Sequence, residues 1–223
     1  SLPQLDAARY GLEQADGVNP IQLDSIVSFM REATGVRAEG YSETLPPFKS
    51  DQNEPADVAT VNADAVPNAE LLGEMNVRFV LSEFDLKGDG PALSVVEGFE
   101  LRTQLGSTRI YENTRDVGRV RGGMVTYWSP NQIVIATTGP GHVVLSEVWY
   151  PGWVARVDGV PAEVERAGPF RAVTVNEGEH EIVFEFRPAA FYWGLALSVT
   201  GWLIQVTVTG RQKPRPSRLL EVR

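Results

Sequence analysis

The sequence predicts an α+β protein that is mainly β, with a mixed α/β N-terminal part, an antiparallel β-sandwich of jelly-roll type and a C-terminal transmembrane helix. Three observations predict it. Apolar residues recur at both helix and strand spacing in the first half, short apolar stretches alternate with turn residues after it, and an uncharged stretch comes near the end. The expected boundaries are 1–122 for the mixed part, 123–187 for the sandwich, 188–210 for the membrane helix and 211–223 for a basic tail.

The N-terminal part begins with a predicted helix. Asn19 and Pro20 are typical of a helix start, because Asn accepts hydrogen bonds from the first turn and Pro fits its geometry. Apolar residues follow at intervals of three and four positions, which predicts one buried face, and Gly35 is the expected C-cap. The residues of that face are Leu23, Ile26, Val27 and Met30.

Asn68 is expected to cap a second, short helix over residues 69–75. Strands are predicted over 77–84, 93–103 and 109–113, where β-branched and aromatic residues gather. This mixture of short helices and strands is the reason for the mixed α/β assignment.

The sandwich is predicted from short strands at nearly regular spacing. The stretches MVTYW, QIVIATT, HVVLSEVWY, WVARV, FRAVTV and EHEIVFEF are separated by residues that favour turns. Asp158 and Gly159 form a strong signal for a two-residue hairpin. Turns are also expected at residues 139–141 and 176–178, because both segments contain glycine beside another turn-forming residue.

Residues 188–210 contain no charged side chain. As a helix, this stretch would be about 34 Å long, enough to cross a bilayer core of about 30 Å. Three aromatic residues, Phe191, Tyr192 and Trp193, stand near its start, where aromatic rings favour the membrane interface. Because its hydroxyl and amide side chains make it only moderately apolar, a buried strand or core helix is the alternative.

The charge distribution predicts the orientation of this helix. The whole chain has a net charge of −9, yet residues 211–223 carry five basic residues and one acidic residue. By the positive-inside rule, the tail is expected in the cytoplasm and the body outside it. Since the N-terminus has no basic-then-apolar run of the secretory type, we expect upstream membrane helices of a longer protein to deliver the body.

Composition also excludes several classes of function. The chain has no cysteine, so disulfides, thiolate metal sites and cysteine nucleophiles are excluded. With only His142 and His180, a multi-histidine metal site is not expected, and the acidic balance argues against nucleic-acid binding. No catalytic residue, metal ligand or cofactor site is predicted in this chain.

The strongest candidate for binding is an aromatic turn at residues 149–153. Trp149, Tyr150 and Trp153 surround a Pro-Gly pair, and their rings offer the apolar surface on which a sugar ring can stack. Arg156 lies nearby and can pair with an anionic acceptor such as a phosphate-rich polymer. The alternative is that these aromatics fill the core or contact lipid headgroups. His180, between two glutamates, is expected to be a surface histidine with a raised pKa.

The run from residue 145 to 198 resembles the C-terminal end of the YfhO family of bacterial membrane proteins. The shared pattern has five parts, found here as Tyr150-Pro151-Gly152-Trp153, Val157-Asp158-Gly159, Phe170-Arg171, Gly178 with His180, and Arg187-Pro188. Weaker similarity extends upstream through the segments 16–20, 68–82 and 109–113. Where the family tends to have Pro-Arg after the last of these, this chain has Val117-Gly118-Arg119.

The resemblance implies a polytopic protein similar to GT-C glycosyltransferases, which transfer sugars from polyprenyl-phosphate donors to polymers of the cell envelope. In that architecture the catalytic acid lies in an early extracytoplasmic loop, which has no counterpart in this chain. The chain itself is therefore expected to be non-catalytic. Its expected role is to bind an envelope glycopolymer as acceptor, or to brace the membrane helices of the parent protein in the bacterial cell membrane.

Two other classes of function remain open. One is a non-enzymatic envelope domain that binds a protein partner or acts as a scaffold. The other is a secreted hydrolase, which would need a pocket with paired carboxylates about 5–10 Å apart. An exposed aromatic groove would favour glycan contact, whereas fully buried aromatics would favour the scaffold.

Overall fold

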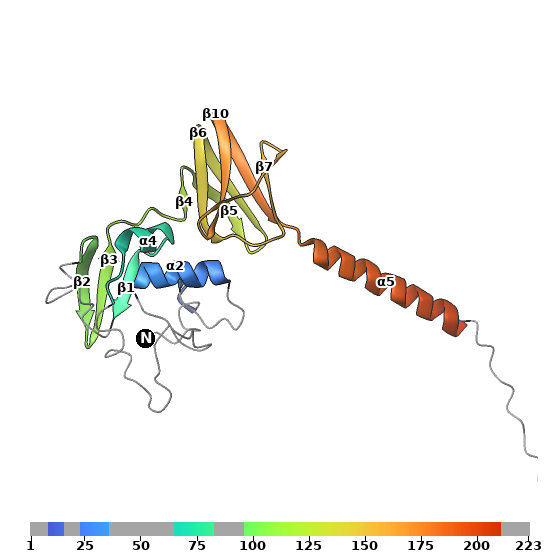
Figure 1. Cartoon of the computed structure of the whole chain (residues 1–223), viewed down its shortest axis with the longest axis horizontal. Helices are drawn as coiled ribbons and strands as arrows, with labels where there is room; N and C mark the ends of the chain where they lie inside the picture. Colours follow the sequence, from blue (N-terminus) through green and yellow to red (C-terminus); the bar gives the residue numbers. More distant parts are fainter. Residues whose placement is uncertain (1–8, 16–22, 36–64, 83–95, 211–223) are drawn as a thin grey trace, which may run out of the picture.

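A computed structural model describes residues 9–15, 23–35, 65–82 and 96–210 of the chain (Figure 1). The described part is mainly β, with two antiparallel sheets, few helices and one long apolar helix at its C-terminal end, which confirms the predicted class in outline. The finer prediction of a jelly-roll-like sandwich, and the domain boundaries, stay predictions. The elements are α2 (Asp24–Thr34), α4 (Ala69–Glu74), β1 (Phe79–Ser82), β2 (Phe99–Leu105), β3 (Thr108–Asn113), β4 (Val120–Arg121), β5 (Met124–Ser129), β6 (Gln132–Val148), β7 (Trp153–Val157), β8 (Val160–Ala162), β9 (Glu165–Ala167), β10 (Phe170–Phe186) and α5 (Ala189–Gly210).

Two caps that the sequence predicts are present, the C-cap of α2 and the N-cap of α4. Gly35 ends α2 in the left-handed conformation, with a φ of 69°, and its N–H donates to the carbonyl of Arg31. The Asn68 side chain accepts hydrogen bonds from the backbone N–H groups of Glu70 and Leu71 at the start of α4. The predicted start of the first helix at Asn19 and Pro20 is wrong, because the N-cap of α2 is Leu23, whose backbone is extended and whose side chain makes no capping hydrogen bond.

The smaller sheet has the strand order β1-β3-β2. Its core is shared with the two helices, because Ala33 of α2 and Leu72 of α4 are buried with Phe99 and Tyr111 of the sheet. Asn113, at the end of β3, holds this assembly together: its buried side-chain amide donates to the carbonyls of Ala69 (2.8 Å) and Val77 (3.0 Å). A buried amide satisfied in this way stabilises one arrangement of helix and sheet.

The larger sheet has seven strands and is built on β6 and β10, each 17 residues long. These two strands pair along most of their length, with a register shift between Val175 and Gly178. The predicted turns at 139–141 and 176–178 are therefore wrong, since both segments lie inside strands. The turn-forming residues face each other across the two strands, and they bend both strands at the same level instead of ending them.

The bend folds the sheet back over its own core. Residues from both halves of the two long strands belong to one buried cluster, with Ile133, Ile135, Ile182 and Phe184 from one half and Val143, Leu145, Val173 and Val175 from the other. The inward positions of β10 are odd-numbered before the register shift and even-numbered after it. The shift thus keeps the apolar side chains on the inner face, because an uninterrupted strand would turn them outward past that point.

As a result, the bend lies at one end of the larger sheet and both ends of β6 and β10 lie at the other. We call this second end the base, and define it by the turns at residues 129–132 and 149–153 together with the end of β10. In Figure 1, α5 leaves from the base and extends away from the rest of the molecule. Residues 189–207 of this helix are apolar, with a mean hydropathy of 1.3, and none of that stretch is buried.

The hairpin between β7 and β8 confirms the prediction made for Asp158 and Gly159. Both residues have positive φ, 51° and 80°, as a tight two-residue turn of this kind requires. The Asp158 carboxylate also accepts a hydrogen bond from the backbone N–H of Glu181 at 2.9 Å. The hairpin is thereby joined to β10 as well as closed on itself.

The paired bend yields the first testable prediction. A methyl group on Gly139 would overlap the backbone carbonyl oxygen of Asn176, which belongs to the opposite bend. We expect Gly139→Ala to lower the free energy of unfolding by about 2 kcal/mol, because backbone must move to relieve the overlap. Gly141→Ala is the matched control, since nothing lies within 4 Å of a methyl group there. Urea unfolding of the whole chain in detergent micelles measures both; equal losses would contradict the close approach.

Candidate functional site

The aromatic turn at residues 149–153 is held on both sides at the base. The backbone N–H of Trp149 donates to the carbonyl of Pro169 at 2.7 Å, which joins the turn to the segment before β10. The carbonyl of Gly152 accepts from the backbone N–H of Arg187 at 2.6 Å, immediately before α5. The turn is therefore a fixed part of the junction between the sheet and the apolar helix.

Three of the four predicted site residues come together in one depression of about 350 Å³. Tyr150 is half exposed, while Trp149 and Trp153 are partly buried. The depression is lined by Trp149, Tyr150, Pro151, Gly152, Trp153, Val154, Ala155, Pro161, Ala162 and Val164. No charged residue is among them, so the surface offered is apolar and aromatic.

Arg156, the fourth predicted residue, does not line this depression. On β7 the side chains of Trp153, Ala155 and Val157 pack against the core, so Arg156 falls on the opposite, exposed face of the strand. The strict alternation of a strand places it there. The structure thus brings the aromatic residues together and leaves Arg156 apart from them.

Two arginines that the sequence reasoning missed lie on the tryptophans instead. The guanidinium carbon of Arg166 lies 3.5 Å from the centre of the Trp149 ring, and that of Arg171 lies 3.7 Å from the Trp153 ring. These two arginines are opposite each other in the pairing of β9 with β10. In the sequence, Gly168 between the two segments indicates a turn that would pair them. Only the register of the pairing shows that both arginines meet the aromatic turn.

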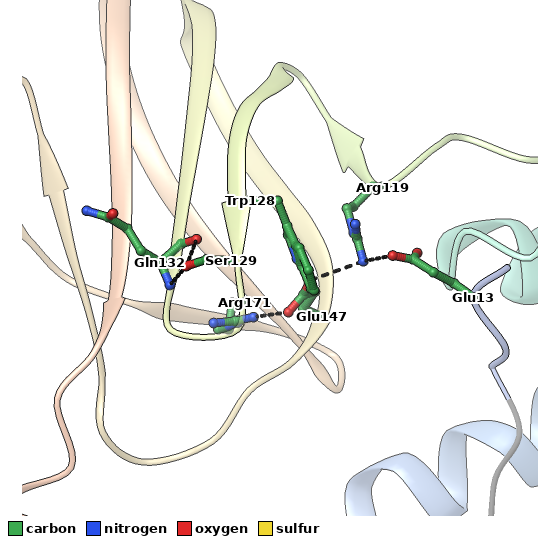
Figure 2. A network of polar contacts seen from close by, with 7 residues as sticks. All are labelled: Glu13, Arg119, Trp128, Ser129, Gln132, Glu147 and Arg171. Carbon is green, nitrogen blue, oxygen red and sulfur yellow. Dashed lines mark hydrogen bonds and ion pairs between the residues drawn. The ribbon is translucent and has the colours of Figure 1, made fainter. Parts of the chain in front are cut away.

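Arg171 also anchors a polar network inside the base (Figure 2). Its Nη2 donates to Oε2 of Glu147 at 2.6 Å, and Oε1 of Glu147 accepts from the Trp128 indole N–H at 3.1 Å. Arg119 extends the network, with its Nη2 3.5 Å from Glu147 and 3.0 Å from Glu13. The network therefore connects β10, β6, β5 and the N-terminal part.

The Arg171 guanidinium is the most deeply buried charge in the described part of the chain, with only 1% of its side chain exposed. Burial lowers the pKa of Arg171 to about 10, although the charge of Glu147 opposes this shift. Arg171 is still protonated at neutral pH. Its Nε and Nη1 atoms are buried without a hydrogen-bond partner, so Glu147 and the Trp153 ring supply its main compensation.

A second depression, of about 640 Å³, lies alongside His180 between β5, β6 and β10. His180 Nδ1 is 2.7 Å from Asp158 Oδ2, and this hydrogen bond raises the pKa of His180, which confirms the prediction. The pKa of Asp158 is lowered, mainly by the hydrogen bond from the backbone N–H of Glu181 and next by the same contact with His180. Within the described residues, no group of three histidine or acidic side chains could hold a metal ion.

Taken together, these groups form a surface suited to binding. The aromatic rings offer apolar faces, and the arginines behind them make those faces electrically favourable for partial negative charge. Glu147, two residues before the aromatic turn, is already engaged by Arg171 and Trp128. It is therefore committed to holding the base together.

The buried pair predicts an asymmetric response to mutation. Glu147→Gln keeps an acceptor for Trp128 but leaves the buried Arg171 charge without a counter-ion, and we expect it to cost about 3 kcal/mol of unfolding free energy. Adding Arg171→Met to that variant should recover more than half of the loss, because the uncompensated charge is removed. Urea unfolding of the four proteins in the cycle measures the coupling. A double variant less stable than Glu147→Gln would contradict the role assigned to the pair.

The His180 contact predicts a dependence of stability on pH. Because its pKa is raised in the folded state, the contact with Asp158 stabilises fully below the unfolded pKa of about 6.5 and is lost as pH rises through the folded value. In histidine proton NMR, His180 should titrate at a higher pH in the unchanged protein than in the Asp158→Asn variant. Identical His180 titrations in the two proteins would be incompatible with this contact.

Comparison with known proteins identifies no relative of this chain. No family model, no curated protein and no solved structure matches the chain. The resemblance to the YfhO family therefore stays a prediction.

Proposed function

We propose that this chain is the extracytoplasmic β domain and last membrane helix of a polytopic bacterial membrane protein similar to GT-C glycosyltransferases. In this proposal the chain is non-catalytic. The parent protein transfers a sugar from a polyprenyl-phosphate donor to an envelope polymer, and this domain braces the membrane part and contacts the acceptor. The body lies outside the cell membrane, and the basic tail lies in the cytoplasm.

The observation that carries the proposal is the junction between the base and α5. Gly152 of the aromatic turn is hydrogen-bonded to Arg187, two residues before the helix, and α5 is long and apolar enough to cross a membrane. The Trp153 and Phe186 rings pack 5.3 Å apart at the same place. A domain attached in this way stays close to its helix, which is what a bracing role requires.

The depression at the aromatic turn supports acceptor contact as the second part of the proposal. Tyr150 lies at the edge of this depression and is 49% exposed. The volume of the depression, about 350 Å³, is within the range of sites that bind small ligands. The back faces of Trp149 and Trp153 are occupied by arginines, so a glycan would meet the remaining faces of the rings. We also propose that the larger sheet is a sandwich of jelly-roll type, with the two halves of the folded sheet as its two layers.

A binding experiment tests the acceptor role. The whole chain in detergent micelles is titrated with purified anionic envelope glycopolymer, and binding is followed by tryptophan fluorescence. We expect Tyr150→Ala to weaken binding about fivefold or more, because stacking on an aromatic ring contributes about 1 kcal/mol. Phe79→Ala is the matched control, since Phe79 is an aromatic residue of similar exposure on the smaller sheet. Equal affinities of the two variants would leave the scaffold as the function.

Catalysis is tested separately with the same preparation. The chain is incubated with a polyprenyl-phosphate sugar and the acceptor polymer, and sugar incorporation is compared with a heat-denatured sample. We expect no difference between them, because no charged residue lines the depression at the aromatic turn. Incorporation above the denatured sample would overturn the non-catalytic assignment.

A further inference from the structure

We infer that the base of the larger sheet lies in the headgroup layer of the bilayer, with the Tyr150 side chain among the phospholipid headgroups. The inference rests on the proposed function in one respect, namely that α5 spans the membrane. It goes further by assigning the base to the phospholipid surface, so that the aromatic depression would meet its acceptor at the level of the headgroups.

First, the length of the uncharged stretch fixes the depth of Arg187 in the bilayer. The uncharged stretch runs from residue 188 to 210 and is bounded by Arg187 and Arg211. As a helix it measures about 34 Å, whereas the bilayer core is about 30 Å thick, so only about 4 Å remains at the two ends together. Since a charged side chain avoids the core, Arg187 must lie at its border.

The second step is the attachment of the base to Arg187. The Arg187 backbone N–H donates to the Gly152 carbonyl at 2.6 Å, and the Phe186 N–H donates to the Asn131 carbonyl at 2.9 Å. A methyl group on Gly152 would lie 3.0 Å from the Phe186 ring and 3.1 Å from Pro188, so the turn is packed directly on this segment. The turns at 149–153 and 129–132 are thus both held at the level of Arg187. No spacer separates the base from the helix.

The third step is the chemistry of the exposed side chains. Tyr150 and Trp128 are 49% and 46% exposed at the base, and both combine an apolar ring with a polar group, as residues of a membrane interface do. The exposed rings of Phe191, Tyr192 and Trp193 continue this aromatic band into the first turns of α5. Arg187 is paired with Glu185 at 2.6 Å, so this pair offers a positive group to headgroup phosphates and a negative group to headgroup ammonium ions.

The opposite end of the sheet gives the natural comparison. Glu177 lies in the bend, nine residues before Phe186 along β10, which corresponds to about 30 Å in an extended strand. The headgroup layer is only about 5–7 Å thick, so Glu177 lies well outside it. The inference therefore predicts contact with lipid at Tyr150 and with water at Glu177.

Single-cysteine labelling tests the inference directly, because the chain has no cysteine of its own. Tyr150→Cys, Glu177→Cys and Leu197→Cys are each labelled with a fluorophore. The whole chain is then reconstituted in vesicles of phosphatidylethanolamine and phosphatidylglycerol that contain nitroxide lipids, with the nitroxide on either the headgroup or the acyl chain. We expect headgroup nitroxide to quench Tyr150→Cys about threefold more than Glu177→Cys, given the difference in depth.

The Leu197 label tests the membrane span of α5 separately from the position of the base. Leu197 lies within α5, so acyl-chain nitroxide should quench it if the helix spans the bilayer. Failure at Leu197 overturns the membrane span and the inference with it. Quenching at Leu197 together with equal values at Tyr150 and Glu177 overturns the inference alone, and leaves the aromatic depression open to a soluble acceptor. Pro130→Cys, in the exposed turn beside Asn131, repeats the measurement if the Tyr150 variant does not fold.

Discussion

The close approach of two backbones at Gly139 and Asn176 is the constraint on which the rest of the structure depends. A strand of 17 residues is too long for one flat layer of a domain this size, and β6 and β10 avoid that problem by bending together. The bend requires a residue without a side chain where the two bends meet, since any Cβ on Gly139 would occupy the position of the Asn176 carbonyl. One glycine therefore allows one sheet to enclose its own core.

The same bend concentrates chemistry at the base. Because both ends of each long strand return to one end of the sheet, Glu147 and Arg171 from the end of β6 and the start of β10 meet Trp153 beside the end of β10. The apolar helix begins at that end as well. A buried cation, an aromatic turn and a membrane-length helix are thus neighbours for a topological reason, although they are distant in sequence.

The mechanical and chemical roles of the base support each other. The Arg171–Glu147 pair is costly to bury, and both residues belong to the same half of the folded sheet. The contacts of Arg171 with Trp153 and of Glu147 with Trp128 join this half to the other one. The arginines behind the tryptophans fix the rings, so that an exposed residue such as Tyr150 is presented from a rigid support. A rigid aromatic surface next to a helix long and apolar enough to cross a membrane is what the proposed bracing role would use.

Local signals in the sequence determined the helix caps at Gly35 and Asn68, the Asp158–Gly159 hairpin and the long apolar helix, because each depends on residues near one another in the chain or on composition alone. The raised pKa of His180 was predicted, but its cause is tertiary, since the partner Asp158 lies 22 positions away in the chain. Only the tertiary structure decided that the glycines at 139–141 and 176–178 bend strands rather than end them, since a glycine permits both and the facing strand selects one. It also decided which cations meet the aromatic turn. Arg156 is nearest in sequence, but strand alternation turns it away, and the register of β9 with β10 brings Arg166 and Arg171 to the tryptophans instead.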